Sequence, residues 1–167
     1  MADYTDSAFY KVRRWLIQEL SDNGIGEIQV VPIQQVPEVE NQDTIGGGPG
    51  GWVPGDESFI VYDVLVPGGY DTQYWNCRDE VMLWVYDYDV ERLFEIKEFM
   101  YDLFGRFDLS AADINSMEDD SPFLFHYFDI MMGLPTDQAD QVLGRKGMNM
   151  VISYEYTRPR LANGRFA

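Results

Sequence analysis

The feature that most constrains this chain is the distribution of its acidic residues. Residues 37–120 hold twenty acidic and four basic side chains, which gives half of the chain a formal charge of −16 out of −17 for all 167 residues. The same stretch is rich in Phe, Tyr, Trp, Ile, Leu and Val. Because acidic and large apolar residues are interleaved, the sequence predicts an acidic surface over a folded core and not a disordered acidic tail.

Length and composition bound the fold and exclude some functions. A chain of 167 residues with 46% hydrophobic and 15% aromatic residues favours one globular domain. No apolar run approaches the ~20 residues that cross a bilayer, so no membrane partner is expected. An acidic surface repels phosphates, which argues against nucleic acid as a bound ligand. Cys77 is the single cysteine, so an internal disulfide and a cysteine-based zinc cluster are excluded.

The spacing of apolar residues predicts a first helix over about Asp6–Asn23. Thr5 or Asp6 is expected to cap its start, and Asn23-Gly24 is expected to stop it in a left-handed conformation. Apolar side chains define one face, and basic and polar ones are expected on the opposite face. The apolar positions are Phe9, Val12, Leu16 and Leu20, and the polar positions are Lys11, Arg14 and Gln18.

Periodicity and turn residues divide the rest of the chain. The predicted order after the first helix is strand 27–36, loop 41–57, strand 58–66, strand 80–86, helix 89–104, strand 123–131 and strand 148–157. Pro32 indicates an edge strand or a bulge, and Pro67-Gly68-Gly69 predicts a turn. Gly105 is expected to end the second helix, and no regular element is predicted from there to Ser121.

This order predicts an α+β fold in a single domain over residues 1–157. The sequence α-β-β-β-α-β-β contains a strand–helix–strand crossover over residues 80–131, which favours a sheet with both helices packed on it. We expect the sheet to be mixed and mostly antiparallel. The Gly-rich loop 41–57 is an insertion into this domain, and the basic segment 158–167 is expected to form a C-terminal arm.

The second helix carries the sharpest local pattern in the chain. Its acids lie at i, i+4, i+7 and i+11 and therefore form one narrow stripe, with the apolar residues on the far side. The stripe consists of Glu91, Glu95, Glu98 and Asp102. Like charges at i, i+4 cost about 0.2–0.5 kcal/mol per pair. The stripe is interpreted either as an ordinary solvated face or as a wall that a polyanion passes without binding.

Two other segments are candidates for contacts with neighbouring chains. Trp52 follows the glycine run 46–51, in a loop that is expected to order on contact with a neighbour. Arg158, Arg160 and Arg165 lie in the terminal arm, which contains no acidic residue. The arm is interpreted as disordered, as folded over its own acidic surface, or as docked on the acidic surface of another copy.

Residues that could carry catalysis or metal binding are few. Asp87 and Asp89, together with the acidic run 118–120, offer oxygen ligands for Mg²⁺ or Ca²⁺, although Asp89 is also a natural helix cap. His126 lies in an aromatic strand and is expected to be a partly buried structural residue. Cys77 is expected to be a buried or inert thiol. The sequence therefore favours a protein that is not an enzyme and that needs no cofactor.

The pattern as a whole resembles the tail terminator, or tail-completion, proteins of tailed bacteriophages. The resemblance is carried by the segment Ser7–Leu20, the strand Val30–Val36, the unit Val81–Asp89 that leads into the second helix, and the closing strand Met148–Thr157. It implies a small α+β subunit of a hexameric ring in the virion neck, assembled in the host cytoplasm. The implied partners are the tail tube protein and a head-side connector or stopper protein. DNA would pass through the ring without being bound specifically.

Three alternatives remain open from the sequence. A head-closure or adaptor protein of the same neck region would share the acidic composition. An acidic DNA-mimic inhibitor would use the carboxylates to occupy a DNA-binding enzyme, as a monomer or dimer. A metal-dependent hydrolase would use Asp87, Asp89 and the run 118–120.

Overall fold

The computed structural model describes residues 8–32, 58–70, 76–118, 121–132 and 146–157, which form an α+β fold as predicted. The helices of this part are α1 (Ala8–Asp22), α2 (Val90–Phe104) and α3 (Asp108–Asn115). Its strands are β1 (Gln29–Pro32), β2 (Phe59–Tyr70), β3 (Asn76–Asp87), β4 (Leu124–Met132) and β5 (Lys146–Thr157). The loop 41–57, with Trp52, and the arm 158–167 lie outside the described residues.

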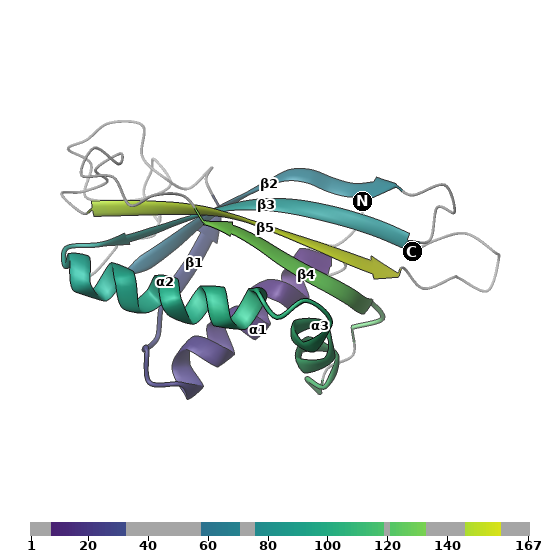
Figure 1. Cartoon of the computed structure of the whole chain (residues 1–167), viewed down its shortest axis with the longest axis horizontal. Coiled ribbons are helices and arrows are strands. Elements are labelled where there is room, and N and C mark those ends of the chain that lie inside the picture. Colours follow the sequence, from purple (N-terminus) through teal and green to yellow (C-terminus); the bar gives the residue numbers. More distant parts are fainter. Residues whose placement is uncertain (1–7, 33–57, 71–75, 119–120, 133–145, 158–167) are drawn as a thin grey trace, which may run out of the picture.

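The five strands form one mixed sheet in the order β1-β2-β3-β5-β4. β1 pairs with β2 in parallel, and the other three pairings are antiparallel. β3 and β4 are both antiparallel to β5, so they run in the same direction and the connection through α2 is the predicted crossover. Figure 1 shows α1, α2 and α3 on the same face of the sheet. The helical layer therefore covers one sheet face.

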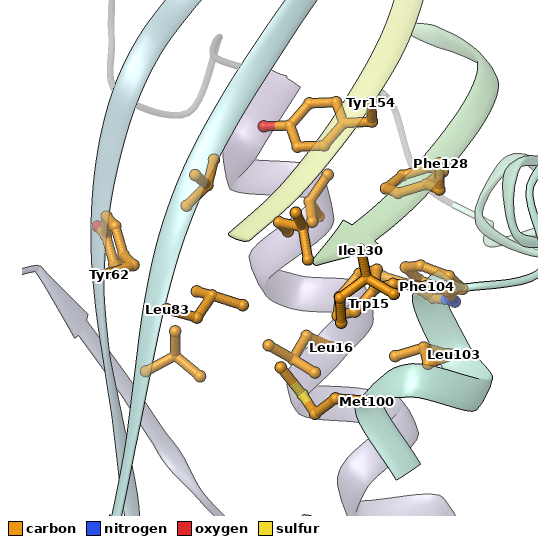
Figure 2. Packing of buried hydrophobic residues seen from close by; sticks show 14 of the residues in the cluster. Trp15, Leu16, Tyr62, Leu83, Met100, Leu103, Phe104, Phe128, Ile130 and Tyr154 are labelled. Carbon is orange, nitrogen blue, oxygen red and sulfur yellow. The ribbon is translucent and has the colours of Figure 1, made fainter. Parts of the chain in front are cut away.

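The main core lies between this helical layer and the sheet. Trp15 of α1 meets Phe104 of α2 edge to face, with ring centroids 5.6 Å apart, and meets Phe128 of β4 at 5.7 Å. Phe128 in turn packs on Tyr154 of β5 at 5.2 Å. Figure 2 shows these rings converging from two helices and two strands. This contact network fixes the position of α2 on the sheet.

The first helix agrees with its predicted apolar face, since Phe9, Val12, Leu16 and Leu20 are all buried. Gly24 has a φ of +77°, which confirms the left-handed stop. The expected caps Thr5 and Asp6 lie outside the described residues. Lys11 contradicts its predicted exposure: it is only 4% exposed, and its ammonium lies 5.9 Å from the centre of the Phe125 ring. The long apolar stem of lysine lets such a residue lie within a core.

Two local predictions are wrong. Pro67-Gly68-Gly69 does not form a turn but continues β2, where the pairing with β3 shifts register between Val64 and Val66 and again between Val66 and Gly69. Bulges of this kind accommodate proline and glycine in a strand. The stretch after Gly105 also contains an element that was not predicted, the eight-residue helix α3.

The outer edges of the sheet are covered by side chains and turns. On β4, the Phe125 N–H donates to Asn115 Oδ1 at 2.9 Å, and Asn115 Nδ2 donates to the Phe125 carbonyl at 2.7 Å. The Phe128 N–H donates to the carbonyl of Phe107 at 3.3 Å. On β1, the Val30 carbonyl accepts from Arg13 Nε at 2.9 Å. These contacts satisfy backbone groups that an edge strand otherwise leaves unpaired.

Candidate functional site

The second helix is anchored at its start by two aspartates. Asp89 is the N-cap, and its carboxylate accepts from the Glu91 N–H at 3.0 Å. Asp87 Oδ1 accepts from the Asp89 N–H at 2.8 Å, and its other oxygen accepts from the Ser58 hydroxyl of the segment before β2. These contacts join the end of β3 to the start of α2. They hold the helix in a fixed orientation over the sheet.

One face of α2 is buried in the core, as predicted. The residues that make up this face are Leu93, Ile96, Met100, Leu103 and Phe104. The predicted acidic stripe lies on the opposite face, where all four side chains are exposed. Helical spacing therefore placed the stripe correctly, because a helix that buries one face must present the other to solvent.

The stripe is a surface of nearly uncompensated negative charge. Arg92 forms an ion pair with Glu95 at 3.1 Å, and Arg106 Nε donates to the backbone carbonyl of Asp102 at 2.8 Å. Within the described part of the chain, no ion pair joins Glu91, Glu98 or Asp102 to a basic side chain. Lys97 lies instead over the Phe94 ring, 5.7 Å from its centre. The outward face of α2 therefore keeps an excess of carboxylates that repels phosphates.

Asp87 and Asp89, predicted as possible metal ligands, serve local structure. Each accepts a backbone hydrogen bond at the start of α2, and Asp87 accepts a second bond from Ser58. The described residues contain no cluster of three or more His, Cys, Asp or Glu side chains arranged to hold a metal. Asp119 and Asp120, the other candidates, lie outside the described residues. Among the described candidates, Asp87 and Asp89 therefore act as hydrogen-bond acceptors at the start of α2.

A shallow hollow of about 290 Å³ lies next to this junction, between the start of β1, the end of β3 and α2. Ile25, Gly26, Glu27, Ile28, Ser58, Asp87 and Arg92 line it. Arg92 lines the hollow and forms an ion pair with Glu95, and Asp87 accepts a hydrogen bond from Ser58. Because its polar groups have protein partners, the hollow is a junction between elements and offers few groups to a ligand.

His126 and Cys77 are placed differently from each other. His126 is exposed, which contradicts the expected partial burial. It follows the buried Phe125, so strand alternation points it outward, and the bulge between Phe125 and Tyr127 leaves Tyr127 exposed as well. Its Nε2 lies 2.5 Å from Thr157 Oγ1, which donates to Asn76 Oδ1 at 3.1 Å. Cys77 is 4% exposed, so the prediction of a buried thiol is confirmed. The burial of Cys77 argues against a reactive thiol at that position.

Sequence reasoning did not single out two features of the polar interior and the surface. Asp79 is 4% exposed on β3 and accepts a hydrogen bond from the Tyr156 hydroxyl at 2.9 Å. The inward direction of Asp79 could have been predicted from the sequence, because Cys77, Asp79 and Val81 are alternate residues of one strand and therefore share a face. Phe107 and Tyr127 stack at the surface, with ring centroids 5.3 Å apart. No local sequence pattern predicts this pair, because Phe107 lies in a turn and Tyr127 lies in a strand 20 residues further along the chain.

Comparisons with known proteins do not place the chain in a family: no model of a protein family matches it, and no curated protein sequence is similar to it. Among the described residues, no helix is both long and apolar enough to cross a membrane. Trp52, Arg158, Arg160 and Arg165, the predicted contact residues, lie outside the described residues. The exposed stripe on α2 is therefore the site on which a functional proposal can be built.

Proposed function

We propose that this chain is a structural virion protein, a subunit of a tail terminator ring that caps a phage tail tube and joins it to the head-side connector. In this proposal α2 faces the lumen, and DNA passes the acidic stripe without binding to it. Copies of the chain, the tail tube protein and a connector or stopper protein are its partners. The protein carries out no catalysis.

The observation that carries the proposal is the acidic stripe on a rigidly held helix. Glu91, Glu98 and Asp102 point to solvent without a described basic partner, and α2 is fixed by its buried face and by the Asp87–Asp89 junction. At physiological ionic strength, electrostatic screening acts over about 8 Å. A ring lined by such helices would therefore repel the phosphates nearest its wall while leaving the duplex free to slide.

The first test of the proposal is the mass of the protein in solution, measured by light scattering at several protein concentrations and with purified tail tubes. We expect a closed ring of about six copies, in free solution or on the tubes. A chain that stays monomeric even with tubes present contradicts the proposal.

The second test concerns the stripe. A variant with Glu91→Gln, Glu95→Gln, Glu98→Gln and Asp102→Asn should assemble to the same mass but retain DNA, seen as slower electrophoretic migration of duplex DNA. The matched control neutralises four acids outside α2 and outside the hollow beside it, namely Glu19, Asp22, Asp63 and Glu118. Equal DNA retention by both variants would show that total charge matters and that the stripe does not line a DNA path.

The acidic stripe also suits two of the alternatives. A head-closure or adaptor protein would form a ring as well, and would bind the head-side connector while leaving tail tubes uncapped. A DNA-mimic inhibitor would remain a monomer or dimer and would bind a basic protein through α2. Neutralising the stripe would then abolish that complex, whereas a terminator ring should still form.

A further inference from the structure

The outer face of β4, away from the helical layer, exposes a group of apolar side chains. Leu124 is 52% exposed and Tyr127 is 41% exposed. Leu124 lies opposite Thr157 and Tyr127 lies opposite Glu155, so their spacing matches two residues of β5, roughly 7 Å, and the exposed His126 lies between them in the chain. Phe107 stacks on Tyr127 from the turn before α3 and is 47% exposed. We name Phe107, Leu124 and Tyr127 the β4 outer patch.

The backbone at Phe107 is strained in a way that keeps the patch in place. Phe107 has φ 55° and ψ −113°, and the Leu109 N–H donates to the Arg106 carbonyl at 3.0 Å. These values match the first central position of a type II′ turn, where glycine is the usual residue. Strained backbone is concentrated at functional sites, and aromatic residues are enriched at protein interfaces, so Phe107 is a candidate contact residue.

Negative charge surrounds the apolar centre of the patch. Glu155 is exposed on β5 between Tyr127 of β4 and Arg78 of β3, and Asp108 is exposed next to Phe107. The two nearby arginines, Arg78 and Arg106, form ion pairs with Glu80 and Asp113, so Asp108 and Glu155 leave the surface net negative. Within the described part of the chain, neither carboxylate forms an ion pair. A partner for this surface therefore needs apolar side chains together with positive charge.

Residues 158–167 of the chain have this chemistry. The segment reads Arg-Pro-Arg-Leu-Ala-Asn-Gly-Arg-Phe-Ala, with three arginines, no acidic side chain, and the apolar residues Leu161 and Phe166. We propose that this segment of one copy docks on the β4 outer patch of a neighbouring copy. Its guanidinium groups pair with Asp108 and Glu155, and an apolar side chain packs on the Phe107–Tyr127 pair. The inference rests on the proposed function, because it names the contact that closes the ring.

The direction of the strands favours a neighbouring copy over the same chain. β5 ends at Thr157, beside Leu124, and β4 runs back from Leu124 toward Tyr127, antiparallel to β5. Beyond Leu124, the segment of the same chain would have to reverse its direction to lie along Tyr127 of its own patch. Arg158 precedes a proline, and such residues favour extended backbone over a tight reversal. Ten extended residues span at most about 33–36 Å, enough to reach an adjacent domain.

The test is disulfide trapping between full-length copies. One copy carries Leu124→Cys at the edge of the patch, and a second copy with a different tag carries Ala162→Cys in the segment. The matched control acceptor is Leu65→Cys, since Leu65 is also a strand leucine and is 46% exposed, but lies on β2. Cys77 is buried and stays in place. We expect the mixed disulfide with Leu124→Cys to form about tenfold or more faster than with Leu65→Cys.

Equal rates at the two acceptors, or no mixed disulfide at either, would overturn the inference. So would a double variant, Leu124→Cys with Ala162→Cys, that closes a disulfide within one chain at a rate independent of dilution, because the segment would then cover its own copy. The mass measurement separates the two proposals. A ring that forms normally without preferential trapping removes the inference alone, whereas a chain that never assembles on tail tubes removes the proposed function.

Discussion

Phe107 has a backbone conformation that glycine normally adopts. The contribution of this conformation to stability can be tested by substitution. Replacing Phe107 by Ala or by Gly removes the same aromatic contact with Tyr127, but only Gly relieves the positive φ. Glycine usually destabilises a fold relative to alanine. At a positive φ the order of stability of the two variants should be reversed, because only glycine adopts this conformation without strain. We expect Phe107→Gly to be more stable than Phe107→Ala by about 1 kcal/mol in urea unfolding. The usual order, with Ala more stable, would show that the turn relaxes.

Single residues also show where prediction from sequence ends. The inward position of Asp79 follows from strand alternation, so its burial could be predicted, but its bond to Tyr156 comes from a strand 77 residues away. The charge of Lys11 predicts a surface residue, but Phe125 of β4 packs against it and Lys11 is buried. Local periodicity determines which way a side chain points. The elements that pack against it decide whether that direction leads to solvent.

At the scale of elements, neutralising an acid should change the stability of the fold in opposite directions at the two ends of α2. Asp102 lies in the last turn, where the helix dipole disfavours an acid, and Glu91 lies in the first turn, where it is favoured. Asp102→Asn should stabilise the fold by about 0.3–1 kcal/mol, because repulsion from Glu98 is relieved as well. Glu91→Gln should be neutral or destabilising. Urea unfolding at low ionic strength measures both, and a stabilisation of equal size in the two variants would contradict the dipole account.

Elements differ in how far the sequence determines them. The boundaries of α2 and the outward direction of its stripe were predicted, because five apolar positions at helical spacing outweigh any alternative. α3 was not predicted, since it has eight residues and buries only Ser110, Ala111 and Ile114. The Pro67-Gly68-Gly69 segment has the composition of a turn, but pairing with β3 draws it into a bulged strand. Neither the insertion of β5 between β3 and β4 nor the β4 outer patch has a local signal.

For the whole molecule, the charge of −17 predicts an unusual response to salt. Repulsion among carboxylates opposes the compact state, and the three described ion pairs are partly exposed and contribute little. Raising sodium chloride from low concentration to about 0.5 M should therefore raise Tm by several degrees, because the repulsion is screened. Potassium chloride should act equally in a thermal melt followed by circular dichroism. A fall in Tm would show that the ion pairs outweigh the repulsion.

The occupied backbone groups at the two edges of the sheet have a consequence for the proposed ring, in which copies of the chain would meet. Exposed strand edges allow chains to add to one another through the backbone alone, in the cross-β manner of amyloid fibres, whatever their side chains. Here Asn115 and Phe107 occupy backbone groups of β4, and Arg13 occupies one of β1. Association is then left to side chains, whose identity restricts it to partners of the right shape and charge. In the proposed ring, high local concentration of the chain would then favour the specific contacts over fibrous precipitation.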